Sequence, residues 1–329
     1  MAIAQDKSDL KPGKARKGLV PLVHDELLDH LMAGLDGAMR EHRGYGETDV
    51  RPVAVEGAGH RHSDSGGCSR RTSYLLRGVE RSNPMTVIEK WNAFVGTVLH
   101  EWVDEGFRRT LPHAEFEVVT SLLIPITDRD GAPVVGLDGI EVAPLLTAGH
   151  ADLRVDMPTA DGPKRVVGEY KTQGGFRFKK NAGFQGEAQG PPYGGLVQAC
   201  MNARALDADE VWMLDIAKEL VAKAYAEDYG LAADDPHRGF STWVFDRDYI
   251  RRVSDFEIRR LVRIVELNAT GQKVPRSVID NGIPKGARIV DPVDGRWQVV
   301  NEDGSVADTG TSYLCIYCSH QDVCIADGP

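Results

Sequence analysis

The chain has 329 residues and a mass of 36.0 kDa, with 42% hydrophobic and 27% charged residues, an ordinary globular composition that permits one large domain or two. Its formal net charge of -10 argues against a protein that coats polyanions non-specifically. No apolar run reaches the length that spans a bilayer, so we expect no membrane partner.

The N-terminal region is polar before it becomes helical. Residues 1–18 are lysine-rich, which predicts a disordered tail and no signal peptide, and hence a reducing, cytoplasmic location. Residues 20–45 carry leucines at helical spacing, which predicts a helix. Residues 46–82 form an irregular stretch around Cys68, rich in glycine, serine and arginine.

A long amphipathic helix is predicted next, over residues 84–110. Asn83-Pro84 is typical of a helix start. His100 lies in this helix, within the segment Gly96-Thr97-Val98-Leu99-His100. Such a histidine is most often a surface residue or a hydrogen-bonded core residue. One face of the helix is expected to be buried, and its residues are Val87, Trp91, Phe94, Val95, Val98 and Trp102.

A hairpin carries the most informative residues of the chain. A strand over 115–125 and an insertion over 132–147 precede it. Its strands are 151–157 and 165–171, and folding about Asp161-Gly162 places Asp152 opposite Lys171. Glu169 and Lys171 are two residues apart, so they share one face of a strand, about 7 Å apart.

These two carboxylates and one ammonium are expected to converge on one spot. Oxygen ligands of this kind suit a hard divalent cation, with the lysine beside a bound water or phosphate. The alternative is a surface hairpin whose Asp, Glu and Lys face solvent.

The second half of the chain alternates helices and strands, which indicates a mixed α/β fold. Residues 174–192 are expected to form a loop over the site, with Phe176, Phe178 and Phe184 as base-stacking or buried residues. A helix over 196–206 carries Gln198 and Cys200, and Cys200 is expected to be a buried hydrophobe. The later elements are strands at 211–216 and 241–245, a helix from Asp248 to Gly271 and a hairpin within 288–310.

Cysteines close the chain as Cys315-x2-Cys318-x5-Cys324, and Cys68 lies far upstream. In a reducing compartment, closely spaced thiolates usually bind metal. Four thiolates suit tetrahedral zinc or a cubane iron–sulfur cluster equally well.

The order of these features resembles the PD-(D/E)XK nuclease superfamily over roughly residues 60 to 329. Within that superfamily, the chain is similar to the RecB-like iron–sulfur exonucleases, which include the CRISPR-associated ones and the nuclease domain of the bacterial AddB subunit. The resemblance implies an α/β fold with a mixed central sheet flanked by helices, a restriction-endonuclease-like core in a single domain of residues 19–329. It also implies a cap of residues 60–82 and 311–329, where a [4Fe-4S] cluster, in preference to zinc, is held by Cys68, Cys315, Cys318 and Cys324.

The resemblance also assigns roles around the hairpin. Lys171 would act on the attacking water or the phosphate, and Gln198 would position Lys171 or the DNA. The family's helix carries Gln-x3-Tyr, whereas here Asn202 stands four residues after Gln198. A literal Gln-x3-Tyr runs from Gln189 to Tyr193, but it includes prolines, which a helix interior excludes. The implied ligands of Mg²⁺ or Mn²⁺ are His100, Asp152, Glu169 and the backbone carbonyl of Tyr170.

The implied activity is metal-dependent exonuclease cleavage of DNA, on single-stranded ends. The partner of such an exonuclease would be a helicase, a recombinase or a CRISPR integration complex. The pathway would be recombination, phage DNA metabolism or spacer acquisition. An oligomeric state is compatible with this prediction. One alternative is a non-catalytic, cluster-bearing DNA-binding or adaptor subunit of such a complex. Another is an unrelated α/β protein with structural zinc.

Overall fold

The computed structural model divides the chain into two compact units, Met1–Arg51 and Pro52–Pro329, and all described residues belong to the second. The predicted tail of residues 1–18 and the helix within 20–45 lie outside them. The described residues are 55–82, 87–111, 113–160, 162–185, 188–274, 288–293, 296–300, 303–304, 306–308 and 318–327.

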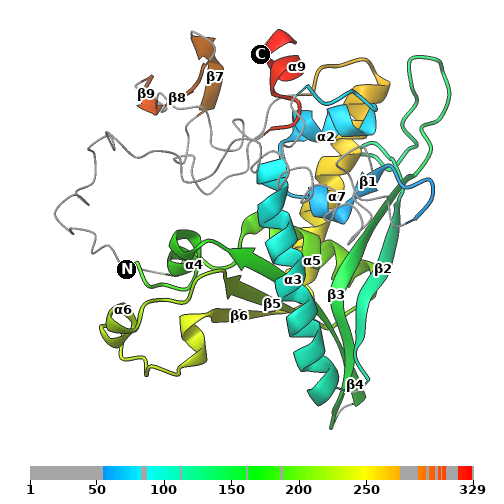
Figure 1. Ribbon diagram of the computed structural model, residues 1–329. Coiled ribbons are helices and arrows are strands. Elements are labelled where there is room, and N and C mark those ends of the chain that lie inside the picture. Colours follow the sequence, from blue (N-terminus) through cyan, green and yellow to red (C-terminus); the bar gives the residue numbers. More distant parts are fainter. Residues whose placement is uncertain are drawn as a thin grey trace. The chain divides into compact units, whose positions relative to one another are not determined.

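A mixed six-stranded sheet forms the centre of the second unit, which confirms the α/β prediction (Figure 1). The long strand β3 pairs antiparallel with β2 and β4 and in parallel with the short β1. β4 is parallel to β5, and β6 is antiparallel to β5 at the edge. The strands are β1 (His60–Arg61), β2 (Glu115–Ile124), β3 (Leu145–Thr159), β4 (Gly162–Gln173), β5 (Glu210–Ala217) and β6 (Phe240–Asp246).

Helix α5 (Tyr193–Ala205) covers one face of the sheet and contacts β2, β3, β4 and β5. Small and apolar side chains allow this close packing, and the predicted buried thiol of Cys200 is fully enclosed there. Burial raises the pKa of Cys200 to about 12, so the thiol stays protonated at neutral pH. Helix α7 (Arg247–Ala269) packs on α5, and α2 (Ser69–Leu76) packs on α7.

Helix α3 (Val87–Thr110) lies across the sheet and contacts β4 (Figure 1). Its side chains Leu99, Val103 and Phe107 pack against Leu153, Tyr170 and Ile216. The prediction that Trp91 and Trp102 belong to the buried face of this helix was wrong, because their side chains are 44% and 77% exposed. The contact face instead follows Leu99, four residues before Val103 and eight before Phe107, as helical periodicity allows.

The stretch predicted as a loop over residues 174–192 contains a helix, α4 (Gly175–Asn181). Phe178 and Phe184 are buried in a small cluster with Val221 of the following segment, and Phe176 is exposed. The remaining short helices of this region are α6 (Lys223–Glu227) and the 3-10 turn η3 (Pro236–Arg238).

The predicted C-terminal hairpin is present with an additional strand. β7 (Arg288–Val293), β8 (Arg296–Val300) and β9 (Val306–Asp308) form a separate three-stranded sheet. Helix α9 (Gln321–Ala326) follows, and the 3-10 turn η2 (His62–Asp64) precedes α2. Among the described residues, no helix is both long enough and apolar enough to cross a bilayer.

Candidate active site

Lys171 is the centre of the candidate site, on the face of β4 that α5 covers. Its Nζ donates to Glu169 Oε1 at 2.6 Å and to Gln198 Oε1 at 3.0 Å. Glu169 and Lys171 share this face because they are two residues apart on the strand. Glu169 is 1% exposed, whereas the lysine side chain keeps 26% of its surface open.

Asp152 reaches the same end of the hairpin from β3. Its Oδ2 accepts the backbone N–H of Tyr170 at 2.6 Å, and its Oδ1 lies 3.7 Å from Nδ1 of His100 on α3. The aromatic ring of Tyr170 points to the α3 face, where it stacks on Phe107 and meets the His100 ring edge-on. Lys171, Glu169, Gln198, Asp152 and His100 therefore come together from four elements.

The predicted register of this hairpin was wrong, because the centre of the turn lies one residue earlier than predicted and each residue therefore faces a partner two positions away from the predicted one. Leu153 pairs with Gly168 and Thr159 with Gly162, so two residues link the strands and Gly162 belongs to β4. Gly162 follows these two residues with φ +112, a left-handed conformation that glycine adopts without steric cost. The pairing ends at Leu153 and Gly168, and beyond it the Asp152 carboxylate accepts the backbone N–H of Tyr170, so Asp152 is not paired with Lys171 as predicted.

The charges of these groups are strongly coupled. Burial raises the pKa of Glu169 to about 8, although Lys171 opposes the shift, and the charge of Asp152 adds to it. Burial also acts on Asp152, but His100, Lys171 and the Tyr170 N–H outweigh it and lower its pKa. The pKa of Lys171 is raised, because Glu169 and Asp152 outweigh its burial. One lysine therefore faces two buried carboxylates and does not neutralise both.

This imbalance predicts a pH-dependent stability. Folding raises the pKa of Glu169 from 4.5 to about 8, so the folded protein binds this proton more tightly than the unfolded chain does. The stabilisation of the folded state by this proton is complete below pH 4.5 and is lost as pH rises through 8. In EDTA, the free energy of unfolding should fall between pH 5.5 and 8 by up to about 1.4 kcal/mol per pH unit from this proton. Urea unfolding of wild type and Glu169→Gln at both pH values measures it.

The Glu169→Gln protein should show a flatter pH dependence, and Glu227→Gln on the surface of α6 is the matched control. Parallel pH profiles for wild type and Glu169→Gln would contradict the raised pKa.

Asn202, which stands at the position of the family's Tyr and was given no role from the sequence, organises a hydrogen-bond network behind Glu169. Asn202 is fully buried on α5, and its Nδ2 donates to the His150 carbonyl at 2.7 Å and to Glu169 Oε2 at 3.3 Å. Its Oδ1 accepts from Thr120 at 2.8 Å and lies 2.7 Å from Nδ1 of His62. The spacing of four residues from Gln198 on one helix was the available signal.

Gly195 gives Lys171 its space. A Cβ at Gly195 would lie 2.6 Å from Cε of Lys171, so an alanine there must displace the lysine side chain. Gly195→Ala should reduce the activity proposed below at least about 10-fold without unfolding the helix, because misplacing a reactive group is costly and alanine favours helix. Initial rates of DNA degradation and thermal melting test this.

Gly194→Ala is the matched control, because its Cβ would meet its nearest neighbour, the carbonyl of Ser65, at 3.8 Å. Equal losses in both variants would mean that the effect arises from the helix and not from Lys171.

The carboxylate oxygens of the site suit Mg²⁺ or Mn²⁺ in kind. Within the described ranges, no group of three His, Cys, Asp or Glu side chains is arranged to hold a metal ion. Lys171 and Asn202 each donate to one oxygen of Glu169, and each oxygen keeps a second lone pair that a metal ion could take. The incomplete neutralisation of the two carboxylates is what a divalent cation would complete.

The thiols of Cys68 and Cys324 both act electrostatically on that of Cys318, and Cys315 falls outside the described residues. Burial raises the pKa of Cys318, a backbone N–H of His320 and the charge of Arg71 oppose it, and the other two thiols add to it. Cys68 is the N-cap of α2, and Cys324 lies in α9.

Hydrogen bonds join the segments that carry these cysteines. His320 is fully buried, stacks on Tyr74 and lies 3.1 Å from the carbonyl of Val79 through its Nε2. The hydroxyl of Tyr74 donates to Asp327 at 2.7 Å, and Ser82 accepts the N–H of Asp322. The two segments predicted to form a cap are therefore in contact.

The fold defines an α/β protein with a mixed six-stranded sheet flanked by helices. No family model matches the chain, and no curated protein matches it. Among solved structures, the crystal structure of SSO0001 is similar with a TM-score of 0.46 and 14% identity, over 91% of this chain and 97% of that chain.

A second similar structure is that of Scheffersomyces stipitis Rai1 in complex with (3'-NADP)+ and calcium ion. Its TM-score is 0.20 and its identity 12%, over 51% of this chain and 36% of that chain. Both scores are too low to support an argument about this protein, so function is inferred from the site.

Proposed function

We propose that the protein is a metal-dependent deoxyribonuclease of the PD-(D/E)XK type, an exonuclease that acts on single-stranded ends. The observation that carries this proposal is the meeting of Lys171 with Glu169 and Gln198, beside Asp152 and His100, at the end of one hairpin. A buried acid pair with a single lysine is costly to a fold and suits chemistry on a phosphodiester.

Asp152, Glu169 and His100 would hold Mg²⁺ or Mn²⁺, together with the carbonyl of Tyr170. When bound, the ion supplies Lewis-acid polarisation of the phosphate and a lower pKa for the attacking water. Lys171, held by Glu169 and Gln198, would direct its charge to the water or to the phosphate oxygens. The backbone N–H of Tyr170 holds the Asp152 carboxylate in place.

The thiols of Cys68, Cys318 and Cys324, together with Cys315, would hold a structural [4Fe-4S] cluster. The contacts of Tyr74 and Val79 with the C-terminal segment support a cap of this kind. Four thiolates also suit zinc, so iron and acid-labile sulfide analysis of anaerobically purified protein distinguishes the two cofactors.

The test of the proposed activity is degradation of an end-labelled single strand of DNA in Mn²⁺. Wild type should degrade the strand, and EDTA or the substitution Asp152→Asn should stop it. Asp156→Asn is the matched control, because Asp156 lies on the same strand in an exposed ion pair with Arg165. Equal degradation by wild type and Asp152→Asn would end the enzymatic claim at these residues, and no degradation by wild type would favour an adaptor subunit.

A further inference from the structure

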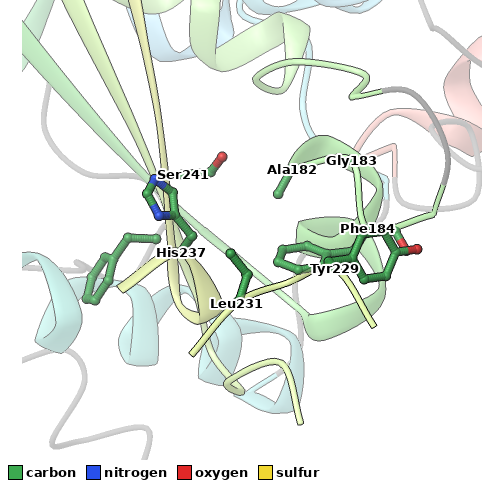
Figure 2. A pocket seen from close by; sticks show the side chains of 8 residues that line it. Ala182, Gly183, Phe184, Tyr229, Leu231, His237 and Ser241 are labelled. Atoms are coloured by element: carbon green, nitrogen blue, oxygen red, sulfur yellow. The ribbon is translucent and has the colours of Figure 1, made fainter. Parts of the chain in front are cut away.

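A pocket of about 350 Å³ lies at the β6 edge of the sheet, apart from the residues assigned above (Figure 2). Its apolar walls are Phe184, Tyr229, Leu231 and Phe240, and its polar groups are His237 and Ser241. This volume is at the lower end of the range for small-molecule sites, and it suits one planar, largely apolar group with polar edges.

The aromatic wall of this pocket is held in place by buried neighbours. Phe184 is buried beside Phe178, and its ring meets that of Tyr229 edge-on, with centroids 5.2 Å apart. The hydroxyls of Tyr225 and Tyr229 both donate to the carbonyl of Phe184. Tyr229 nevertheless remains 47% exposed and Phe240 42% exposed, so two aromatic surfaces face solvent.

The strand register connects the pocket to the candidate active site. Lys171 on β4 pairs with Asp215 on β5, and Asp215 pairs with Ser241 on β6. Adjacent strands are about 4.8 Å apart, so the backbone at Ser241 lies about 10 Å from that at Lys171. A stacked nucleic-acid strand advances about 3.4 Å per nucleotide, so a few nucleotides span this distance.

Cationic side chains accompany the aromatic ones on this side of the sheet. Nζ of Lys179 lies 4.8 Å from the ring centre of Tyr225, and Nζ of Lys180 lies 4.9 Å from that of Phe176. Both lysines belong to α4, the helix that directly follows β4. Alternation of aromatic rings and ammonium groups is the pattern that binds single strands, because bases stack on rings and phosphates pair with cations.

We propose that this pocket binds one unpaired nucleobase of the strand whose phosphodiester lies at Lys171. The base would contact the rings of both Tyr229 and Phe240, and His237 and Ser241 would offer hydrogen bonds to its edge. This inference rests on the proposed nuclease function, since it names the substrate contact of that site.

The test measures binding of a labelled short oligothymidylate in EDTA, so that hydrolysis does not interfere. Tyr229→Leu and Phe240→Ala should each weaken binding about 5- to 150-fold, the loss typical of one stacked base. A single abasic nucleotide moved along the strand should weaken wild-type binding at one position only, and Tyr229→Leu should lose that preference. Phe256→Ala, an exposed aromatic of α7, is the control and should bind like wild type.

Unchanged affinity in both pocket variants, with melting temperatures near that of wild type, would overturn the base-binding proposal and leave the pocket to an apolar protein partner. Equal weakening at every abasic position would overturn it as well. DNA degradation in Mn²⁺ separates the two proposals. If DNA is degraded but binding does not depend on the pocket residues, only the base-binding proposal is contradicted. If binding depends on the position of the abasic nucleotide but DNA is not degraded, only the nuclease function is contradicted.

Discussion

Replacing Lys171 by alanine is expected to slow degradation of single-stranded DNA in Mn²⁺ by about 10²- to 10³-fold, the usual loss when one preorganised electrostatic group is removed. The ammonium bonds to Glu169 at 2.6 Å and to Gln198 at 3.0 Å, so its position is fixed before substrate arrives. Its removal also leaves Asp152 and Glu169 without their shared cation, which should raise the pKa of Glu169 further.

Initial rates on an end-labelled strand measure this loss, with Lys164→Ala as the matched control. Lys164 lies on the same strand and pairs with Glu210 at 39% side-chain exposure, so its removal should leave the rate nearly unchanged. Melting at pH 6 in EDTA shows whether Lys171→Ala remains folded, because Glu169 is protonated there. Wild-type rates in Lys171→Ala would remove the lysine from the mechanism.

Replacing Asn202 by leucine is expected to lower the free energy of unfolding by about 3 kcal/mol or more. Leucine has a similar size, but it removes the hydrogen bond to the His150 carbonyl and leaves the Thr120 hydroxyl and Nδ1 of His62 with only their mutual contact at 3.2 Å. Each buried polar group left unpaired costs about 1–3 kcal/mol. Glu169 would also lose the hydrogen bond to its Oε2, so activity should fall with stability.

Urea unfolding at pH 7 measures this effect, and Arg204→Ala is the control on the same helix. Arg204 forms a 3.5 Å ion pair with Asp255 at the surface, which is worth at most about 1 kcal/mol. A loss below about 1 kcal/mol in Asn202→Leu would mean that water or a rearranged side chain replaces the asparagine in the network.

Most helices and strands were predicted well from the sequence, because helix and strand formation depends largely on residues that are close together in the chain. The strand expected over 211–216 is β5, and the helix expected from Asp248 is α7, although Asp246 is its N-cap and accepts the N–H of Tyr249. The hairpin turn was misplaced by one residue, because local turn preference favours Asp161-Gly162, whereas the observed pairing of Thr159 with Gly162 places Gly162 in the strand.

Sequence patterns predicted those residues of the candidate site that belong to a short motif, but not the residues that reach it from elsewhere in the chain. Glu169, Lys171 and Gln198 meet because strand and helix periodicity place them so. His62 was not predicted, because it reaches Asn202 across 140 residues of sequence and lies in a stretch without regular pattern. Contacts of that range depend on the path of the whole chain, which a single sequence does not reveal.

The bonds of Val79 to His320 and of Tyr74 to Asp327 have a consequence for biosynthesis. These partners are 241 and 253 residues apart, so a chain emerging from the ribosome makes α2 long before the segment that completes its surroundings. Closure of so large a loop is slow, and until it happens the ring of Tyr74 lacks its stacking partner. Nascent chains stalled before residue 318 should therefore be protease-sensitive around α2 while the six-stranded sheet is already resistant.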